Sequence, residues 1–127
     1  MKKALVNIGS RAFRADVADN MFTRAKGLSG RAVLAADEAM LFVFPLAWRY
    51  SFWMKDMKFN LDIVWIRNGA IVDVSENVLA PIPGDSIFKI SKARPSVAVD
   101  AVLEIRAGTV NSLGIRAGDK VEIVGSS

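Results

Sequence analysis

Two charged residues, Lys55 and Asp62, lie inside the most apolar stretch of this 127-residue chain, residues 51–66. The remaining residues of the stretch are mainly aromatic and aliphatic, and lysine and aspartate are almost never buried without a partner. A chain that places both of them there is building an internal ion pair, a binding cleft, or both. The stretch therefore restricts the fold to one that satisfies two charges inside or beside its core.

The composition is that of a dense globular chain. Hydrophobic residues make up 52% of it and charged residues 24%, and its length suits one domain, residues 1–127, with a core of its own. No apolar run approaches the length of a membrane span. We therefore expect a soluble, single-domain protein.

Cysteine and histidine are both absent. Their absence excludes disulfides, thiol nucleophiles, most zinc and copper sites, and every acid–base scheme that uses imidazole. A hard cation would need clustered carboxylates, but the acidic residues are scattered singly apart from Asp37 and Glu38. No ligand motif is complete either, so we expect neither a metal nor a cofactor.

The net charge of +4 and the pI near 9.7 permit contact with anionic partners. Lysine and arginine are dispersed along the chain, with no run longer than Lys2 and Lys3, which favours a solvated basic surface over a nucleic-acid footprint. Residues 4–9 are too few and too quickly interrupted for a signal-peptide core. As given, the chain is expected to be cytoplasmic, or exported if an upstream leader was removed.

Short strands separated by turn signals dominate the chain. Alternating apolar residues predict a half-buried strand over residues 12–18, paired with residues 4–8 in a hairpin, and the apolar run 39–44, stopped by Pro45, is typical of a central strand. Further strands are predicted over residues 52–55, 61–67, 70–75, 97–106 and 120–124, and helices over residues 21–26 and 109–113. The predicted fold is mainly β (α+β), a compact antiparallel β-barrel or sandwich of about seven or eight short strands with two short helices.

Two dipeptides mark tight turns. Asn68 and Gly69 both tolerate positive φ, as a type I′ hairpin turn requires. Gly118 and Asp119 are similar to the glycine–aspartate turn of several small β-barrels, in which the carboxylate caps backbone donors. We assign a structural role to both pairs.

Glu104 adds a third charge to an apolar strand. We expect Lys55, Asp62 and Glu104 to be mostly buried and joined by hydrogen bonds, directly or through Arg24, because an isolated buried charge costs several kcal/mol. A closed network would fix strand register, whereas a functional site leaves a polar group open to a cleft. The residue types favour the structural role.

Arg24 and Arg31 flank Gly27 and Gly30. Exposed backbone N–H groups and two guanidinium groups in such a segment suit a carboxylate or a phosphate. The alternative is that the glycines end a helix while the arginine stems cover apolar surface, and the absence of a phosphate-loop motif favours this alternative. The predicted ligand-binding residues are Arg24, Arg31, Trp53 and Lys55, and no catalytic residue is assigned.

Several short sequence blocks occur together in a fixed order. They are residues 24–31, 40–44, 52–55, 61–63 and 102–104, followed by Ala107, Gly108, Gly114, Ile115, Gly118 and Asp119. With these blocks the chain resembles, over nearly its whole length, the small bacterial and archaeal family catalogued as domain of unknown function 192. The resemblance implies a single-domain, mainly β protein without an established activity, some of whose members carry export signals. Residues 87–99 depart from it, being longer and more basic than the short proline-containing connection expected there.

Three functions stay open at this point. The favoured one is a non-enzymatic binding module whose cleft, between residues 24–31 and 52–55, accepts a small anionic or peptide carboxylate ligand. The second is a nucleic-acid-associated or regulatory β-barrel that uses Lys89, Lys92 and Arg94. No sequence-specific binding to duplex DNA is expected, because no predicted helix suits a major groove. The third is a carboxylate-dependent hydrolase with Asp62 and Glu104 as its pair. Nothing in the sequence indicates the oligomeric state.

Overall fold

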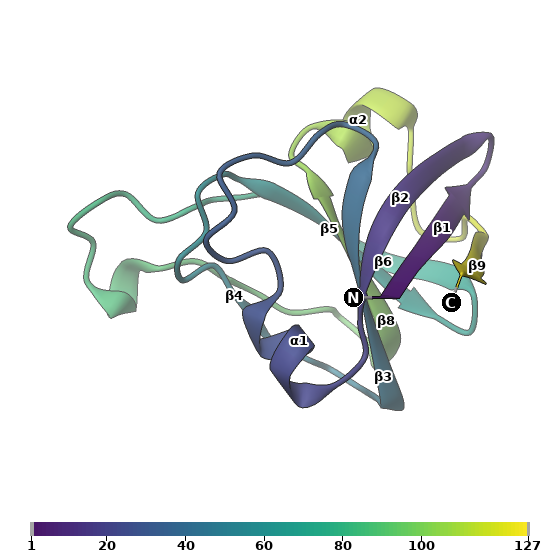
Figure 1. The fold of residues 1–127 in the computed structure, drawn as a ribbon, viewed down its shortest axis with the longest axis horizontal. Helices are drawn as coiled ribbons and strands as arrows, with labels where there is room; N and C mark the ends of the chain where they lie inside the picture. The colour runs from purple at the N-terminus through teal and green to yellow at the C-terminus, as the bar shows by residue number, and fades with distance from the viewer. Residues whose placement is uncertain (1, 127) are drawn as a thin grey trace.

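The protein is mainly β in the computed structural model, which describes residues 2–126. Nine strands and two short α-helices occur within these residues. Seven strands form one curled, half-barrel sheet in the order β6-β5-β8-β3-β2-β1-β9, and β4 and β7 form a separate two-stranded sheet (Figure 1). The elements are β1 (Lys2–Ile8), β2 (Arg11–Ala18), α1 (Met21–Lys26), β3 (Glu38–Trp48), β4 (Phe52–Trp53), β5 (Leu61–Arg67), β6 (Ala70–Val78), a 3₁₀ turn (Ile87–Lys89), β7 (Lys92–Ala93), β8 (Val99–Arg106), α2 (Thr109–Leu113) and β9 (Val121–Ser126).

The predicted fold class is right in outline and is corrected in two respects. The strands number nine within residues 2–126 rather than seven or eight, and β2 pairs with β3 in parallel rather than antiparallel orientation. The other named strand pairs are antiparallel. A parallel pair requires a crossover connection. Residues 19–37 make that connection and carry α1 with them.

Several strands differ by a few residues from their predicted bounds, and two of these differences have a clear structural cause. β3 continues past Pro45 to Trp48, because the register with β8 shifts between Val43 and Trp48 and the irregularity accommodates the proline. Of the predicted strand over residues 52–55, only Phe52–Trp53 is extended. Asp56, with a positive φ of 63°, turns the chain directly afterwards.

The two predicted turns have the backbone that their residues favour. Asn68 and Gly69 have φ of 51° and 73° and connect β5 to β6. Gly118 has φ of 98°, and the Asp119 carboxylate accepts a hydrogen bond from the Arg116 N–H at 3.0 Å. Both pairs of residues therefore have a structural role, since they set the backbone conformation of their turns.

The two ends of the sheet approach each other through β6 and the start of β9. Ala70 forms an isolated antiparallel bridge with Lys120. The Ile71 N–H donates to the Asp119 carbonyl at 2.9 Å, and the Val121 N–H donates to the Gly69 carbonyl at 2.8 Å. These bonds hold the sheet in its curled form.

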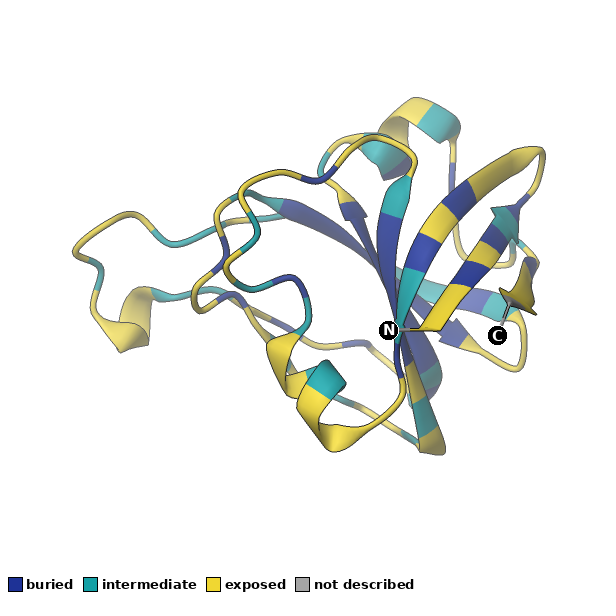
Figure 2. Cartoon of the chain, viewed as in Figure 1, coloured by how far each residue is buried: buried dark blue, intermediate teal, exposed yellow. Residues whose placement is uncertain are grey.

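The sheet is apolar on both faces, and buried residues run along its central strands (Figure 2). Neighbouring residues of a strand point to opposite faces. All of residues 61–66 in β5 are buried for this reason, since they supply both faces at once. The inner core of the curl includes Val64, Ile66, Leu103, Ile105 and Val110 of α2. The core on the second face includes Leu28, Phe42, Met54, Trp65 and Val102.

Asp62 is fully buried on the inner face and is satisfied by backbone donors. Its carboxylate accepts hydrogen bonds from the N–H groups of Asn77 at 2.8 Å, Gly108 at 3.0 Å and Val110 at 2.9 Å. These bonds join β5 to the end of β6 and to the turn that begins α2. Asp62 is therefore a structural carboxylate whose partners are peptide groups rather than a lysine.

Residues 79–91 project from the sheet at the left of Figure 1. Ile82, Ile87 and Phe88 in this arm are exposed. The prolines and the glycine of residues 80–85 keep this part of the chain out of a strand, as the sequence predicts. Within residues 2–126, no helix is both long and apolar enough to cross a membrane.

We predict that Asp62→Ala lowers the free energy of unfolding by about 3–5 kcal/mol, because three buried N–H groups lose their acceptor. Asp62→Asn should lose less, since its amide oxygen still accepts hydrogen bonds. Urea denaturation measures both. Asp85→Ala is the control, because Asp85 accepts one N–H, that of Ile82, in the projecting arm. A loss for Asp62→Ala no larger than that of the control would contradict the assigned role.

Candidate functional site

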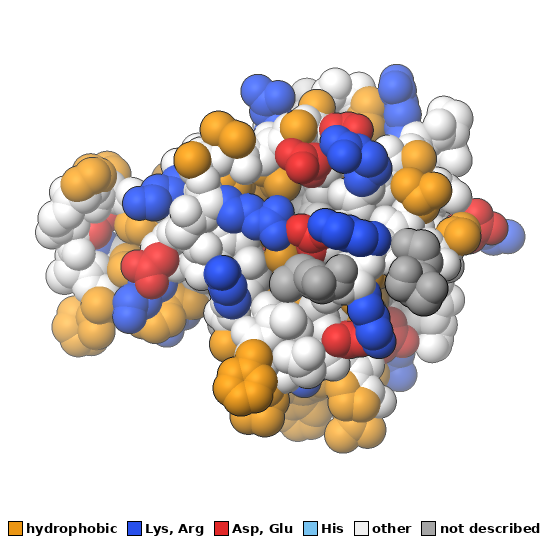
Figure 3. Space-filling model, in the orientation of Figure 1, with side chains coloured by type: hydrophobic (Ala, Val, Ile, Leu, Met, Phe, Trp, Pro, Cys, Tyr) orange, Lys and Arg blue, Asp and Glu red, His pale blue; other side chains and the backbone are white. Residues whose placement is uncertain are grey.

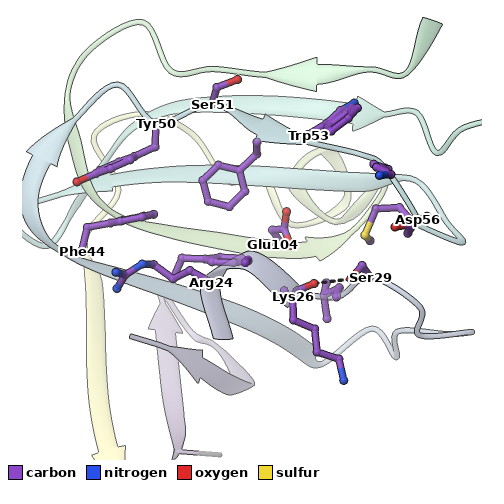
Figure 4. A pocket seen from close by; sticks show the side chains of 16 residues that line it. Arg24, Lys26, Ser29, Phe44, Tyr50, Ser51, Trp53, Asp56 and Glu104 are labelled. Carbon is purple, nitrogen blue, oxygen red and sulfur yellow. Dashed lines mark hydrogen bonds between the residues drawn. The ribbon is translucent and has the colours of Figure 1, made fainter. Parts of the chain in front are cut away.

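A cavity of about 420 Å³ opens between α1 and β4 on the second face of the sheet. Residues 24–29 line one side and residues 50–57 line the other (Figure 4). Phe42 of β3 and Glu104 of β8 lie between the two sides. The cavity thus lies between the two segments from which the sequence analysis builds its cleft.

The position of α1 above the sheet follows from its two ends. Asn20 caps the helix by accepting the Thr23 N–H at 3.0 Å, and the Thr23 hydroxyl accepts the Asn20 N–H in return. Gly27 ends the helix with φ of 48°, and a Cβ at this position would lie 3.0 Å from the Phe42 ring. Glycine therefore permits close packing on the sheet, and the next residue, Leu28, is buried there.

Aromatic side chains form much of the cavity wall. Phe52 meets Phe42 edge to face with ring centroids 4.7 Å apart, and it meets Trp65 in the same way at 5.5 Å. Tyr50 stacks on Phe44 at 3.7 Å. Because these rings pack on one another, they form an apolar wall of fixed shape.

Glu104 is the most deeply buried polar side chain of the cavity, with 5% of its surface exposed. It lies between Met40 of β3 and Ile63 of β5 in the sheet. Its carboxyl group forms no hydrogen bond or ion pair within residues 2–126, and its oxygens open onto the cavity, since no enclosed side-chain oxygen in this part of the chain lacks a partner. Burial raises the pKa of Glu104 from 4.5 to about 8. At pH 7 the group is therefore mainly a neutral acid that donates as well as accepts a hydrogen bond.

Two of the predicted binding cations lie against aromatic rings. The Arg24 Nη1 donates to the Val43 carbonyl at 3.0 Å, and its guanidinium lies 5.2 Å from the centroid of the Phe44 ring. The exposed Lys55 Nζ lies 5.4 Å from the Trp53 ring. Arg24, Trp53 and Lys55 all border the cavity.

The charged lining is positive overall. Arg24, Lys26 and Lys55 contribute three cations, and Asp56 contributes one anion while Glu104 is neutral. Such a lining attracts anions more than cations. Within residues 2–126, no group of three or more carboxylates is placed to hold a metal ion.

The predicted network of Lys55, Asp62 and Glu104 is wrong. Both acids are buried, but Lys55 is exposed, and no hydrogen bond joins any two of the three within residues 2–126. In the pairing of β5 with β8, Asp62 is opposite Ile105 whereas Glu104 is opposite Ile63. The two carboxyl groups therefore point to opposite faces of the sheet. The hydrolase alternative loses its geometry as well, because Glu104 faces the cavity without Asp62.

Arg31 is the predicted binding residue that does not border this cavity. Its Nη2 donates to an Asp16 carboxylate oxygen at 2.6 Å. Its own backbone N–H and those of Gly27, Ser29 and Gly30 all donate to backbone carbonyls. The backbone anion cradle expected in this segment is therefore not formed, and an anion here would be held by side chains.

Sequence reasoning missed several residues of the lining, among them Phe44, Tyr50 and Asp56. Phe44 was assigned to the core by its apolar run, and nothing local to Tyr50 distinguishes it from other aromatic residues. Glu104 could be recognised from the sequence as a candidate, because it is an acidic residue in a largely apolar strand. Its lack of a partner depends on neighbours from two other strands.

A curled β-sheet with an aromatic, carboxyl-bearing cavity on one face defines the class of this protein. The chain belongs to the family DUF192, described as "Uncharacterized ACR", whose model matches residues 4–123. This assignment confirms the resemblance found in the sequence and carries no specific function with it.

Two solved structures are similar to this chain. A protein of unknown function from Novosphingobium aromaticivorans DSM 12444 is 31% identical, with a TM-score of 0.79 over 94% of this chain and 83% of that chain. A protein from Sinorhizobium meliloti 1021, described as "a putative transcription regulator", is 28% identical, with a TM-score of 0.80 over 96% of this chain and 92% of that chain. No curated protein matches the chain.

The raised pKa of Glu104 predicts a stability that falls with pH. Between pH 4.5 and about 8 the folded protein keeps a proton that the unfolded chain releases, so the free energy of unfolding decreases as the pH rises through this window. The contribution of Glu104 is complete below the window and lost above it, and amounts to roughly 5 kcal/mol. Glu104→Gln cannot titrate and should show a smaller decrease.

Urea denaturation of wild type and Glu104→Gln at about pH 5 and about pH 9 measures how far the free energy of unfolding of each protein falls between these pH values. Other titrating groups are common to both and cancel in the comparison. An equal decrease in wild type and Glu104→Gln would contradict the burial of an unpartnered acid at this position.

Proposed function

We propose that this protein is a binding module that holds a small carboxylate ligand in the cavity between α1 and β4. The observation that carries the proposal is Glu104. The residue is buried, its carboxyl oxygens open onto the cavity, and within residues 2–126 they have no partner from the chain, so their hydrogen bonds are left to whatever enters the cavity. Its position beside a cavity of ligand size makes a group from outside the chain its natural partner.

The lining favours an anionic ligand with an apolar body. The body packs against the rings of Phe42, Tyr50 and Phe52, which exclude water. The carboxylate lies near the positive lining, and one of its oxygens accepts the hydrogen bond that neutral Glu104 donates. A charge-assisted bond is strong in such surroundings. A cationic ligand would meet three positive side chains instead, one of them Arg24.

N-acetyl-phenylalanine and its uncharged amide test the proposal as a matched pair of probes. Wild type should bind the carboxylate at least tenfold more tightly than the amide, which corresponds to about 1.4 kcal/mol. Arg24→Met should remove most of that difference with little change in melting temperature, because Arg24 is half-buried and bonds one carbonyl. Arg67→Met is the control, since Arg67 is exposed and lies outside the lining. Isothermal titration calorimetry measures the affinities.

The pH dependence of the same titration tests the part played by Glu104. Binding of the carboxylate should weaken as the pH rises through about 8, because the ionised acid repels it. Glu104→Gln should keep the binding and lose this pH dependence. Equal affinity for the two probes, or no binding of either, would refute a carboxylate site.

A second candidate function, a nucleic-acid-associated or regulatory role, is favoured by the description of the Sinorhizobium neighbour. The basic residues named for it are largely engaged within the chain. Lys92 lies 5.6 Å from the Trp53 ring, and the Arg94 Nε donates to the Arg49 carbonyl at 3.2 Å, while Lys89 is exposed in the arm. Basic side chains alternate with acidic ones on the face in Figure 3. Because two of these three basic side chains already have partners within the chain, we favour the binding module over this second function.

We predict no sequence-specific binding to duplex DNA. The helices α1 and α2 span six and five residues, too short to fill a major groove. A gel-shift titration at physiological salt, with random duplex as competitor, measures this directly. Sub-micromolar binding with clear preference for one sequence would contradict the prediction and favour the regulatory role.

A further inference from the structure

β4 is paired on one side only, with β7. Trp53 is opposite Lys92, and the next residue, Met54, donates its N–H to the Ser91 carbonyl at 3.0 Å. In an antiparallel pair, hydrogen-bonded and non-hydrogen-bonded positions alternate along each strand. Trp53 therefore occupies a non-hydrogen-bonded position, and its own N–H and C=O point away from β7.

β4 borders the cavity, since Ser51, Phe52 and Trp53 are all part of its lining. Ser51 and Trp53 lie on one side of it, and Arg24, Lys26 and Ser29 lie on the other (Figure 4). Within residues 2–126, the Trp53 backbone makes no hydrogen bond to a turn, loop or cap. An unpaired strand edge of this kind is a template on which another extended chain pairs.

We infer that the cavity binds an extended peptide segment bearing a carboxylate, which adds to β4 as a further strand. The inference rests on the proposed function and names the class of its ligand. Peptide backbone pairs with the Trp53 N–H and C=O, so the strand edge supplies affinity independent of side chains. The same peptide also satisfies Glu104, with an oxygen that accepts its proton.

The shape and charge of the cavity suit this ligand. Alternate side chains of an extended peptide point the same way, so every second one enters the cavity against the aromatic wall. β4 spans two residues, about 7 Å at 3.3 Å per residue, so a segment of four residues covers it with one residue to spare at each end. The peptide carboxylate is complementary to Arg24, Lys26 and Lys55 in the lining.

An acetylated tetrapeptide of alternating alanine and phenylalanine, with a free carboxylate, is the probe. Wild type should bind it at least tenfold more tightly than N-acetyl-phenylalanine. Binding should slow amide hydrogen exchange at Trp53 at least tenfold, and N-methylation of at least one peptide nitrogen should weaken binding at least tenfold. Each methyl group removes one backbone donor and leaves the side chains in place.

Two variants separate the backbone of Trp53 from its ring. Trp53→Pro removes the ring and the N–H, whereas Trp53→Ala removes the ring alone. Proline is tolerated on a strand edge where the N–H has no ladder partner. Trp53→Pro should bind the tetrapeptide at least tenfold more weakly than Trp53→Ala, while both bind N-acetyl-phenylalanine equally. Thermal melts check that both variants fold. If Trp53→Pro does not fold, binding of the N-methylated peptides to wild type tests the inference instead.

The outcomes distinguish this inference from the proposed function. If N-acetyl-phenylalanine binds but the tetrapeptide binds no more tightly and Trp53 exchange is unchanged, strand addition is refuted and the carboxylate site stands. If neither probe binds, both are refuted. If the tetrapeptide binds and every N-methylated form binds equally well, the peptide does not pair with β4 and the inference is overturned.

Discussion

Both faces of the sheet are apolar, so both must be shielded from water by other parts of the chain. This requirement determines where the remaining segments pack. The six consecutive buried residues of β5 are the clearest example, because they belong to both faces of the sheet. Curling and α2 close the inner face. The second face is covered by chain outside the sheet, which the parallel pairing of β2 with β3 makes available as the crossover 19–37. That crossover and the segment around β4 leave the cavity between them.

The two buried carboxyl groups of this sheet are stabilised differently. Asp62 accepts hydrogen bonds from three backbone N–H groups and so holds β5, β6 and α2 together. Glu104, on the other face, has no partner within residues 2–126, and burial raises its pKa to about 8. Its oxygens open onto the cavity, where a ligand can pair with them. A ligand that binds only the folded state stabilises that state, which couples ligand affinity to folding.

The sequence predicted elements whose signals are local. The bounds of α1 and α2 follow from Asn20, Gly27 and Gly114, and the hairpin of β5 and β6 follows from Asn68 and Gly69. The parallel pair was not predictable in this way, because strand partners depend on contacts distant in the sequence. β3 passed Pro45 for a related reason, since its register shift is a property of the pair it forms with β8.

The site was predictable in place but not in its chemistry. Residues 24–29 and 52–55 stood out by composition, and both border the cavity. Lys55 was expected inside because its neighbours are apolar, but Asp56 turns the chain and leaves the lysine exposed. Glu104 was expected in a network, whereas its strand neighbours are Met40 and Ile63. Which side chains flank a buried acid is decided by three strands together.

The pKa of Glu104, measured by titrating this residue directly, is the most direct test of the claim that the cavity contains a buried acid able to pair with a ligand. Carbon-detected NMR follows its carboxyl carbon, and Glu104→Gln assigns the signal. The structure predicts a midpoint near pH 8, which rises further when a bound carboxylate adds like charge beside it. A midpoint near 4.5, the ordinary value for glutamate, would contradict the burial of an unpartnered acid and remove the basis of the site.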